Sequence, residues 1–276
     1  MHAVFTVASK EFYDGLRNRW VIAITSIFCL MALALAYFGA AASGTVGFTS
    51  LPTTIVSLAS LAVFIIPLIA LLLAYDAIVG EDENGTLLLL LTYPLSRPQL
   101  VLGKFLGHGS ILAVATGLGF GIAAVVIAFF AKNISFGELF SSFAIFITSA
   151  TLLGWVFVAF AYLISVVSLE KSRAAGLALI IWFLFVLVFD LALLGTLVVT
   201  EGKLQPELFP YLLLLNPTDV FRLINLSGFE ATNAYTGVIA IAADAKFSVY
   251  TLLTVLAVWT GSILSLAMLL FKRKTI

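Results

Sequence analysis

Long apolar stretches recur along the chain, and polar segments separate them. A helix needs about 20 mostly apolar residues to cross a bilayer. Six stretches reach that length: residues 20–42, 52–75, 105–131, 139–167, 174–199 and 248–271. The pattern predicts an all-α polytopic membrane protein with six transmembrane helices. Residues 1–276 are expected to form a single transmembrane domain, because no polar segment is long enough to fold alone.

The N-terminal segment 1–19 has apolar residues at helical spacing, which predicts an amphipathic elbow helix that leads into the first span. The stripe consists of Val4, Phe5, Ala8, Phe12 and Leu16, and Lys10, Glu11, Asp14 and Arg17 are expected to lie away from it. Such a helix serves either as a membrane anchor or as an elbow resting against a cytoplasmic partner. The first span is expected to be retained, because its apolar run exceeds the about 7–15 residues of a signal peptide.

Composition excludes several classes of protein. Hydrophobic residues make up 62% of the chain and charged residues 10%, which excludes a disordered protein and a soluble globule. One cysteine excludes a disulfide scaffold. Basic and acidic residues number 14 each, so the zero net charge gives no reason to expect a nucleic-acid partner. Membrane lipid is the surrounding that remains.

Lysine and arginine are distributed unevenly between the two sides of the predicted bundle. Ten of the 14 fall on the side that carries both termini, and four fall on the other side. Because cytoplasmic connections are rich in these residues, both termini are expected to be cytoplasmic. The chain is thus predicted to be a multi-pass protein of a bacterial inner membrane.

The connection 76–104 contains an apolar run that is too short to span a membrane. An acidic cluster at 81–83 precedes Gly85, which permits a tight turn, and the run 87–91 ends at Pro94. A short cytoplasmic helix held between two turns is therefore predicted. It is either a lid on this protein's own helix ends or a knob for a soluble partner, in which case the acidic cluster would orient a basic partner surface.

The outer connection 200–247 is long and is broken by prolines. Its apolar segments 208–215, 220–226 and 238–243 are too short to span, which predicts short re-entrant or interfacial helices. A cap over a pathway and a docking surface for another protein are both compatible with this pattern.

One ionisable residue, Asp190, falls inside a predicted span. A carboxylate within a membrane is costly and is a functional candidate by default. The alternative is a packing carboxyl near the outer leaflet that is bonded to a serine or threonine.

Signatures of catalysis and of metal binding are missing. The chain contains no GxSxG nucleophile elbow and no GxxxxGKS/T phosphate loop. The soft ligands Cys29, His108 and three methionines are scattered, so no metal site is expected. We therefore expect a chain without catalytic residues and without a bound cofactor.

Two glycine pairs with GxxxG spacing, Gly103 with Gly107 and Gly117 with Gly121, lie in the third predicted span. Small residues at this spacing allow helices to approach closely. Packing within the chain and a homodimer seam are the two uses considered.

Three segments together resemble ABC-2 type permeases. They are the loop with Gly85-Thr86, Pro94-Leu95-Ser96-Arg97 and Leu102-Gly103-Lys104; the elbow from Lys10-Glu11 to Trp20; and Asn216 to Leu223 in the outer connection. Within the family, they are most similar to permeases that serve copper-site maturation of nitrous oxide reductase. Gly80 departs from the pattern, since many relatives carry a basic residue there.

The resemblance implies a homodimer bound to a separate cytoplasmic ABC ATPase, which would hold ATP and Mg. A periplasmic copper-binding protein would dock outside. Residues implied in coupling to the ATPase are Glu81, Asp82, Glu83, Gly85, Thr86, Leu87, Leu88, Leu89, Leu90, Leu91, Tyr93 and Arg97. Residues implied in docking of the outer partner are Pro206, Asn216, Pro217, Asp219, Phe221 and Arg222.

Two other functions stay open at this stage. The chain is alternatively an exporter subunit for another small substrate, such as a sulfur species or a lipid-like molecule. It is alternatively a secondary transporter, although such proteins usually have charges at the midplane and internal repeats.

Overall fold

The computed structural model describes residues 2–38, 47, 50–130, 135–200, 209–226 and 247–274, and these residues contain helices and no strand. Among the described residues, six helices are long and apolar enough to cross a membrane. They are α2 (Trp20–Phe38), α3 (Leu51–Ala74), α6 (Arg97–Phe130), α7 (Phe136–Val167), α8 (Lys171–Phe183) continued by η2 (Leu184–Val188) and α9 (Phe189–Val199), and α13 (Val249–Arg273). The prediction of an all-helical protein with six spans is confirmed.

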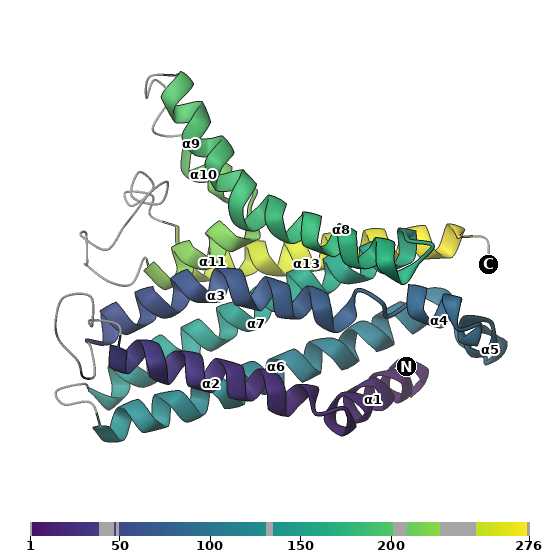
Figure 1. Cartoon of the computed structure of the whole chain (residues 1–276), viewed down its shortest axis with the longest axis horizontal. Helices are drawn as coiled ribbons and strands as arrows, with labels where there is room; N and C mark the ends of the chain where they lie inside the picture. The colour runs from purple at the N-terminus through teal and green to yellow at the C-terminus, as the bar shows by residue number, and fades with distance from the viewer. Residues whose placement is uncertain are drawn as a thin grey trace.

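Five short helices complete the described part: α1 (His2–Arg17), α4 (Val79–Glu83), α5 (Thr86–Thr92), α10 (Phe209–Leu213) and α11 (Pro217–Leu226). Figure 1 shows α1, α4, α5 and both ends of the chain at one end of the bundle. In the outer connection, Pro206 and the apolar segment 238–243 lie outside the described residues.

The core is built around α7, which contacts α3, α6, α11 and α13. Aromatic rings connect these helices: Phe120 stacks on Phe28 at 4.9 Å and meets Phe146 edge-on at 4.8 Å between ring centroids. Phe146 in turn contacts Phe221 at 5.8 Å. The outer helix α11 is therefore part of the core and does not lie on the surface of the bundle.

Local sequence sets where several helices begin. Ser248 accepts a hydrogen bond from the amide of Thr251 at 3.1 Å and caps α13. At α6, the Ser96 amide donates to Oε1 of Gln99 at 2.9 Å, which is one of the two bonds of a capping box and marks the start of this helix.

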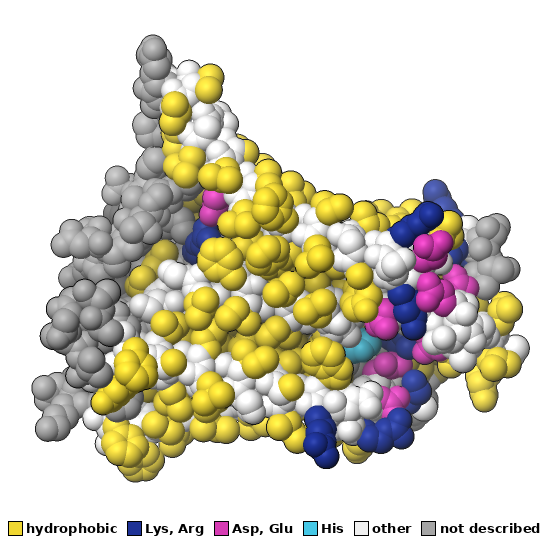
Figure 2. Space-filling view, in the orientation of Figure 1, with side chains coloured by type: hydrophobic (Ala, Val, Ile, Leu, Met, Phe, Trp, Pro, Cys, Tyr) yellow, Lys and Arg dark blue, Asp and Glu magenta, His cyan; other side chains and the backbone are white. Residues whose placement is uncertain are grey.

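The fifth span, α8 to α9, diverges from the bundle in its second half (Figure 1). Only 11% of its most apolar stretch is buried, whereas 72% is buried in α7. Charged side chains gather at the end with α1, α4 and α5, and the flank of the bundle is hydrophobic (Figure 2). This surface is that of a protein surrounded by lipid.

Candidate functional site

The segment between α3 and α6 is anchored to the rest of the bundle at the start of α4. Backbone amides of Ile78 and Val79 donate to the Ser165 hydroxyl of α7 at 2.9 and 3.0 Å. This serine satisfies two of the amides that a helix start leaves without a partner. The first turn of α4 is thus fixed to the central helix of the core.

Each carboxylate of the acidic cluster in α4 has a partner within the chain. Glu81 binds Nζ of Lys104 in α6 at 3.0 Å, and Asp82 binds Nζ of Lys274 at 3.0 Å. The side chain of Glu83 accepts from the backbone amide of Lys171 at 2.7 Å. In this structure the cluster therefore ties α4 to three other segments.

Gly80 leaves room for the side chain of Lys171. A Cβ atom at residue 80 would lie 2.9 Å from Cε of Lys171, closer than such atoms approach one another. A larger residue at position 80 would therefore require the Lys171 side chain to move.

Helix α5 has one buried residue and an exposed apolar surface. Gly85 precedes it with φ of 70°, a conformation that favours glycine. Leu87 is 1% exposed and packs on the chain itself, whereas Leu88, Leu89 and Tyr93 are 59%, 64% and 67% exposed. We call these three residues the α5 surface. One face of this helix thus packs inward on the chain, and the other faces away from it.

Arg97 binds the C-terminal end of α13. Its guanidinium donates to the carbonyls of Phe271 at 3.2 Å and Lys272 at 3.4 Å, and also to that of Lys274. It lies 5.7 Å from the centroid of the Phe271 ring. A cation here satisfies carbonyls that the helix end leaves free, so Arg97 fixes α13 next to the α5 segment.

Sequence reasoning placed Glu11 on the polar face of the N-terminal helix, and this prediction is wrong. The carboxylate of Glu11 is buried against α6 and binds Nζ of Lys104 at 2.8 Å. Lys104, 3% exposed, thus lies between Glu11 and Glu81, and we call these three residues the Lys104 triad. Burial raises the pKa of Glu11, but the Lys104 charge and hydrogen bond outweigh it, so the pKa lies below its ordinary value.

The first glycine pair allows α1 to approach α6. A Cβ atom at Gly103 would lie 2.9 Å from the Val4 carbonyl oxygen, and one at Gly107 would lie 2.5 Å from Cβ of Glu11. Cβ atoms at Gly117 and Gly121 would meet nothing within 4 Å. The first pair therefore serves packing within the chain, and the second pair does not contact a described neighbour.

A second cation between two carboxylates lies where α9 meets α11. Arg222 of α11 donates to Asp190 of α9 and to Asp219, the latter at 3.1 Å. We call these residues the Arg222 triad. Asp190 therefore has an arginine as partner and not the serine or threonine considered for it, and the pairing attaches the fifth span to the outer connection.

The outer motif Asn216-Pro217-Thr218 is built onto the π-helical turn η2. The Asn216 side chain caps α11 by accepting from the Thr218 amide at 3.0 Å, and Pro217 opens the helix. The carbonyl of Phe185 in η2 accepts from Asn216 Nδ2 at 2.9 Å and from Thr218 Oγ1 at 3.1 Å. A π turn often marks a functional position in a helix, and nothing in the sequence indicated this one.

The residues expected to dock an outer partner are placed inside the protein. Asn216, Pro217, Asp219 and Phe221 are buried, and the Arg222 side chain is 17% exposed. In this structure they offer little surface to another protein and instead hold α11 in the core.

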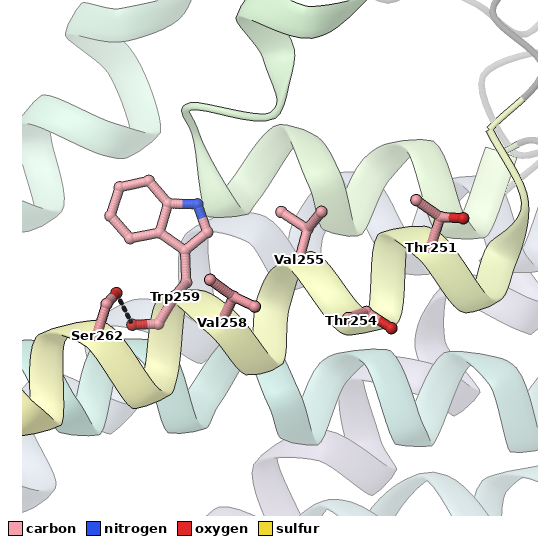
Figure 3. Close-up of a pocket in the computed structure, with 6 residues that line it drawn as sticks. All are labelled: Thr251, Thr254, Val255, Val258, Trp259 and Ser262. Atoms are coloured by element: carbon pink, nitrogen blue, oxygen red, sulfur yellow. Dashed lines mark hydrogen bonds between the residues drawn. The ribbon is translucent and has the colours of Figure 1, made fainter.

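A cavity of about 480 Å³ runs along α13 (Figure 3). Its lining residues are Thr251, Thr254, Val255, Val258, Trp259 and Ser262. The hydroxyls of Thr254 and Ser262 donate to carbonyls of their own helix, and the Trp259 indole donates to Leu214 O at 3.1 Å. The groove thus presents mainly methyl groups and an aromatic ring.

Within the described ranges, no group of three or more His, Cys, Asp or Glu side chains is placed to hold a metal ion. The buried His108 has Nδ1 at 2.6 Å from the hydroxyl of Tyr162 and Nε2 at 3.9 Å from Glu11. It belongs to the packing around the Lys104 triad.

Known proteins similar to this chain are found along its whole length. A family model described as ABC-2 family transporter protein matches residues 5–276. The chain is 59% identical over 274 residues to the probable ABC transporter permease protein NosY of Stutzerimonas stutzeri, covering 99% of both chains. It is 58% identical over 276 residues to the probable ABC transporter permease protein NosY of Pseudomonas aeruginosa, covering 100% of both. The similarity thus includes α1, α4, α5 and α11.

Proposed function

Since the chain belongs to the ABC-2 family of transporter permeases, we propose that it is the membrane subunit of an ATP-driven complex for copper-site maturation of nitrous oxide reductase. The motifs that resemble permeases of this kind imply the role. The similarity to two NosY permeases, 58–59% identical over their full length, supports it. The complex would lie in a bacterial inner membrane, with the end that carries both termini in the cytoplasm.

The observation that carries this proposal is the α5 surface. It lies at the same end of the bundle as both termini, where a cytoplasmic ATPase would bind (Figure 1). Leu87 anchors the helix, while Leu88, Leu89 and Tyr93 are free to enter a groove on the partner. Because the first turn of α4 is bonded to α7, a displacement of α5 would be passed to the core.

A second copy of the chain is proposed to pack against the fifth span. This span has the smallest buried share of the six, at 11%, and permeases of this family work as pairs of membrane domains. Leu191 and Val198 of α9 are 65% and 77% exposed, and a neighbouring copy would cover them together with the groove along α13.

On the outer side, a periplasmic copper-binding protein is proposed to dock on the outer connection. The Arg222 triad and the Phe185 carbonyl join α11 to the fifth span, so α11 can pass movement to the docked protein. The chain would act mechanically, and the copper would be handled by the partner outside the membrane.

A single substitution tests the α5 surface. Leu89→Asp should insert normally but lose the ATPase, because the partner groove would have to bury an unpaired carboxylate at a cost of several kcal/mol. The measurement is MgATP hydrolysis that co-purifies with the tagged chain, together with the copper content of nitrous oxide reductase in the same cells.

Leu89→Met is the matched control, because it keeps an apolar side chain of similar volume. It should retain both signals. Full ATPase activity and full copper loading in the Leu89→Asp variant would exclude α5 as the coupling helix and leave it as a lid.

A further inference from the structure

The Lys104 triad joins three helices that are separate in the sequence. Nζ of Lys104 in α6 lies 2.8 Å from Glu11 in α1 and 3.0 Å from Glu81 in α4. The lysine side chain is only 4% exposed. Its charge is therefore screened little by solvent, and both pairings hold their helices in a defined register.

The connection continues from α4 into α5. The hydroxyl of Thr86, the first residue of α5, donates to the side chain and to the carbonyl of Glu81. A continuous series of hydrogen bonds thus runs from α1 through Lys104 and Glu81 to the first residue of α5. A displacement of α5 would pull on α1 through this series.

Stability alone gives a weak reason for such an arrangement. A buried ion pair contributes little net stability compared with apolar side chains of similar volume, because both charges lose their hydration. Buried charges are better known for fixing one register of helices against another. The Lys104 ammonium binds two carboxylates from different helices, and Lys10 lies 3.3 Å from Glu11. The triad therefore connects three helices and is more than a single ion pair.

We propose that Lys104 is a positioning residue that makes the N-terminal helix α1 follow the movement of α5 during the ATPase cycle. This inference rests on the proposed function of α5. It assigns to α1 a part in force transmission, and α1 is then more than an anchor. Because α1 packs closely on the glycines of α6, a movement of α1 would carry the third span with it.

The test uses the assembled complex with two variants. Glu11→Gln keeps the side-chain volume and leaves Lys104 balanced by Glu81. The triple variant Glu11→Gln, Lys104→Met, Glu81→Gln removes all three charges and leaves no buried charge unpaired. Both should accumulate, melt within about 4 °C of the unchanged protein and retain the ATPase, while copper loading of the reductase falls about tenfold, within the usual range of coupling between sites.

Asp14→Asn is the matched control on the same helix, since its ion pairs with Lys10 and Arg17 are exposed, and it should load copper fully. Full loading in either test variant would overturn the inference. A loss of copper loading that is wholly explained by lower accumulation or a lower melting temperature would also overturn it, because the triad would then have only a structural role. If Leu89→Asp uncouples and Glu11→Gln does not, only the role of Lys104 fails. If Leu89→Asp has no effect, the proposed function of α5 fails itself.

Discussion

Two buried triads, one around Lys104 and one around Arg222, each place a cation between two carboxylates. Such an arrangement responds unequally to the loss of its members. Removing the cation leaves two carboxylates side by side in a poorly hydrated site, whereas removing one carboxylate leaves a balanced pair. The cations should therefore be the sensitive positions at both ends of the molecule.

At the outer end this asymmetry predicts a ranking of two variants. Arg222→Met should lower the free energy of unfolding by about 3–5 kcal/mol, the range for breaking a buried pair from one side. Asp190→Asn should cost about 1 kcal/mol, close to the value of one hydrogen bond. Thermal denaturation of the purified protein in detergent measures both.

The matched control is Arg173→Met, which removes an arginine from an exposed pair with Glu170. Its effect should stay below about 1 kcal/mol, as for other surface pairs. If Arg222→Met and Asp190→Asn lowered the free energy of unfolding equally, the prediction that the cation matters more than one carboxylate would be contradicted.

Among the elements, the contact between α1 and α6 depends on glycine. Gly107→Ala would bring a methyl group against Cβ of Glu11 and against the Ala8 carbonyl at 2.9 Å. Backbone cannot yield as a flexible side chain does, so overpacking should cost about 1–3 kcal/mol. Gly117→Ala in the same helix meets nothing within 4 Å and should have no such cost. Protease cleavage of α1 in membranes would compare the two variants, and equal cleavage would contradict the packing described.

Elements were predictable to the extent that their cause is local. Apolar length predicted the six spans, because length is a property of each segment by itself. Helical period also predicted α1, and its exposed apolar residues Phe5 and Leu16, 64% and 40% exposed, remain available to lipid.

Residues whose partners lie far along the chain could not be placed from the sequence. Hydrophobicity selected one stripe of α1, but the face that packs on the bundle includes Glu11 and Gly15 beside Val4 of that stripe. The reason is Lys104, which lies 93 residues further along the chain and neutralises Glu11. Likewise the resemblance placed Asn216 and Arg222 on an outer docking surface, and their partners Phe185 in η2 and Asp190 in α9 could not be identified without the fold.

For the whole molecule, both ends of the chain lie at the charged end of the bundle (Figures 1 and 2). Lys274 near the C-terminus binds Asp82 of α4, which fixes the C-terminal segment on the side of α5. With the bias of Lys and Arg toward this side, alkaline phosphatase fused after Lys274 should be inactive. The same reporter fused after Thr200 should be active, and the reverse pattern would contradict the orientation.

The π-helical turn η2 holds one residue more than an α-helix uses for the same turn. It therefore shifts the angular phase of everything that follows it in the fifth span. Each residue of an α-helix rotates the next side chain by about 100°. If the same residues formed a regular α-helix, Asp190 would point about 100° away from Arg222, while the span would remain long enough to cross the bilayer. Loss of one residue from Leu184–Val188 would remove the extra residue and leave Asp190 on its present side, whereas loss of one residue from Lys171–Phe183 would rotate the outer half of the span and hardly shorten it.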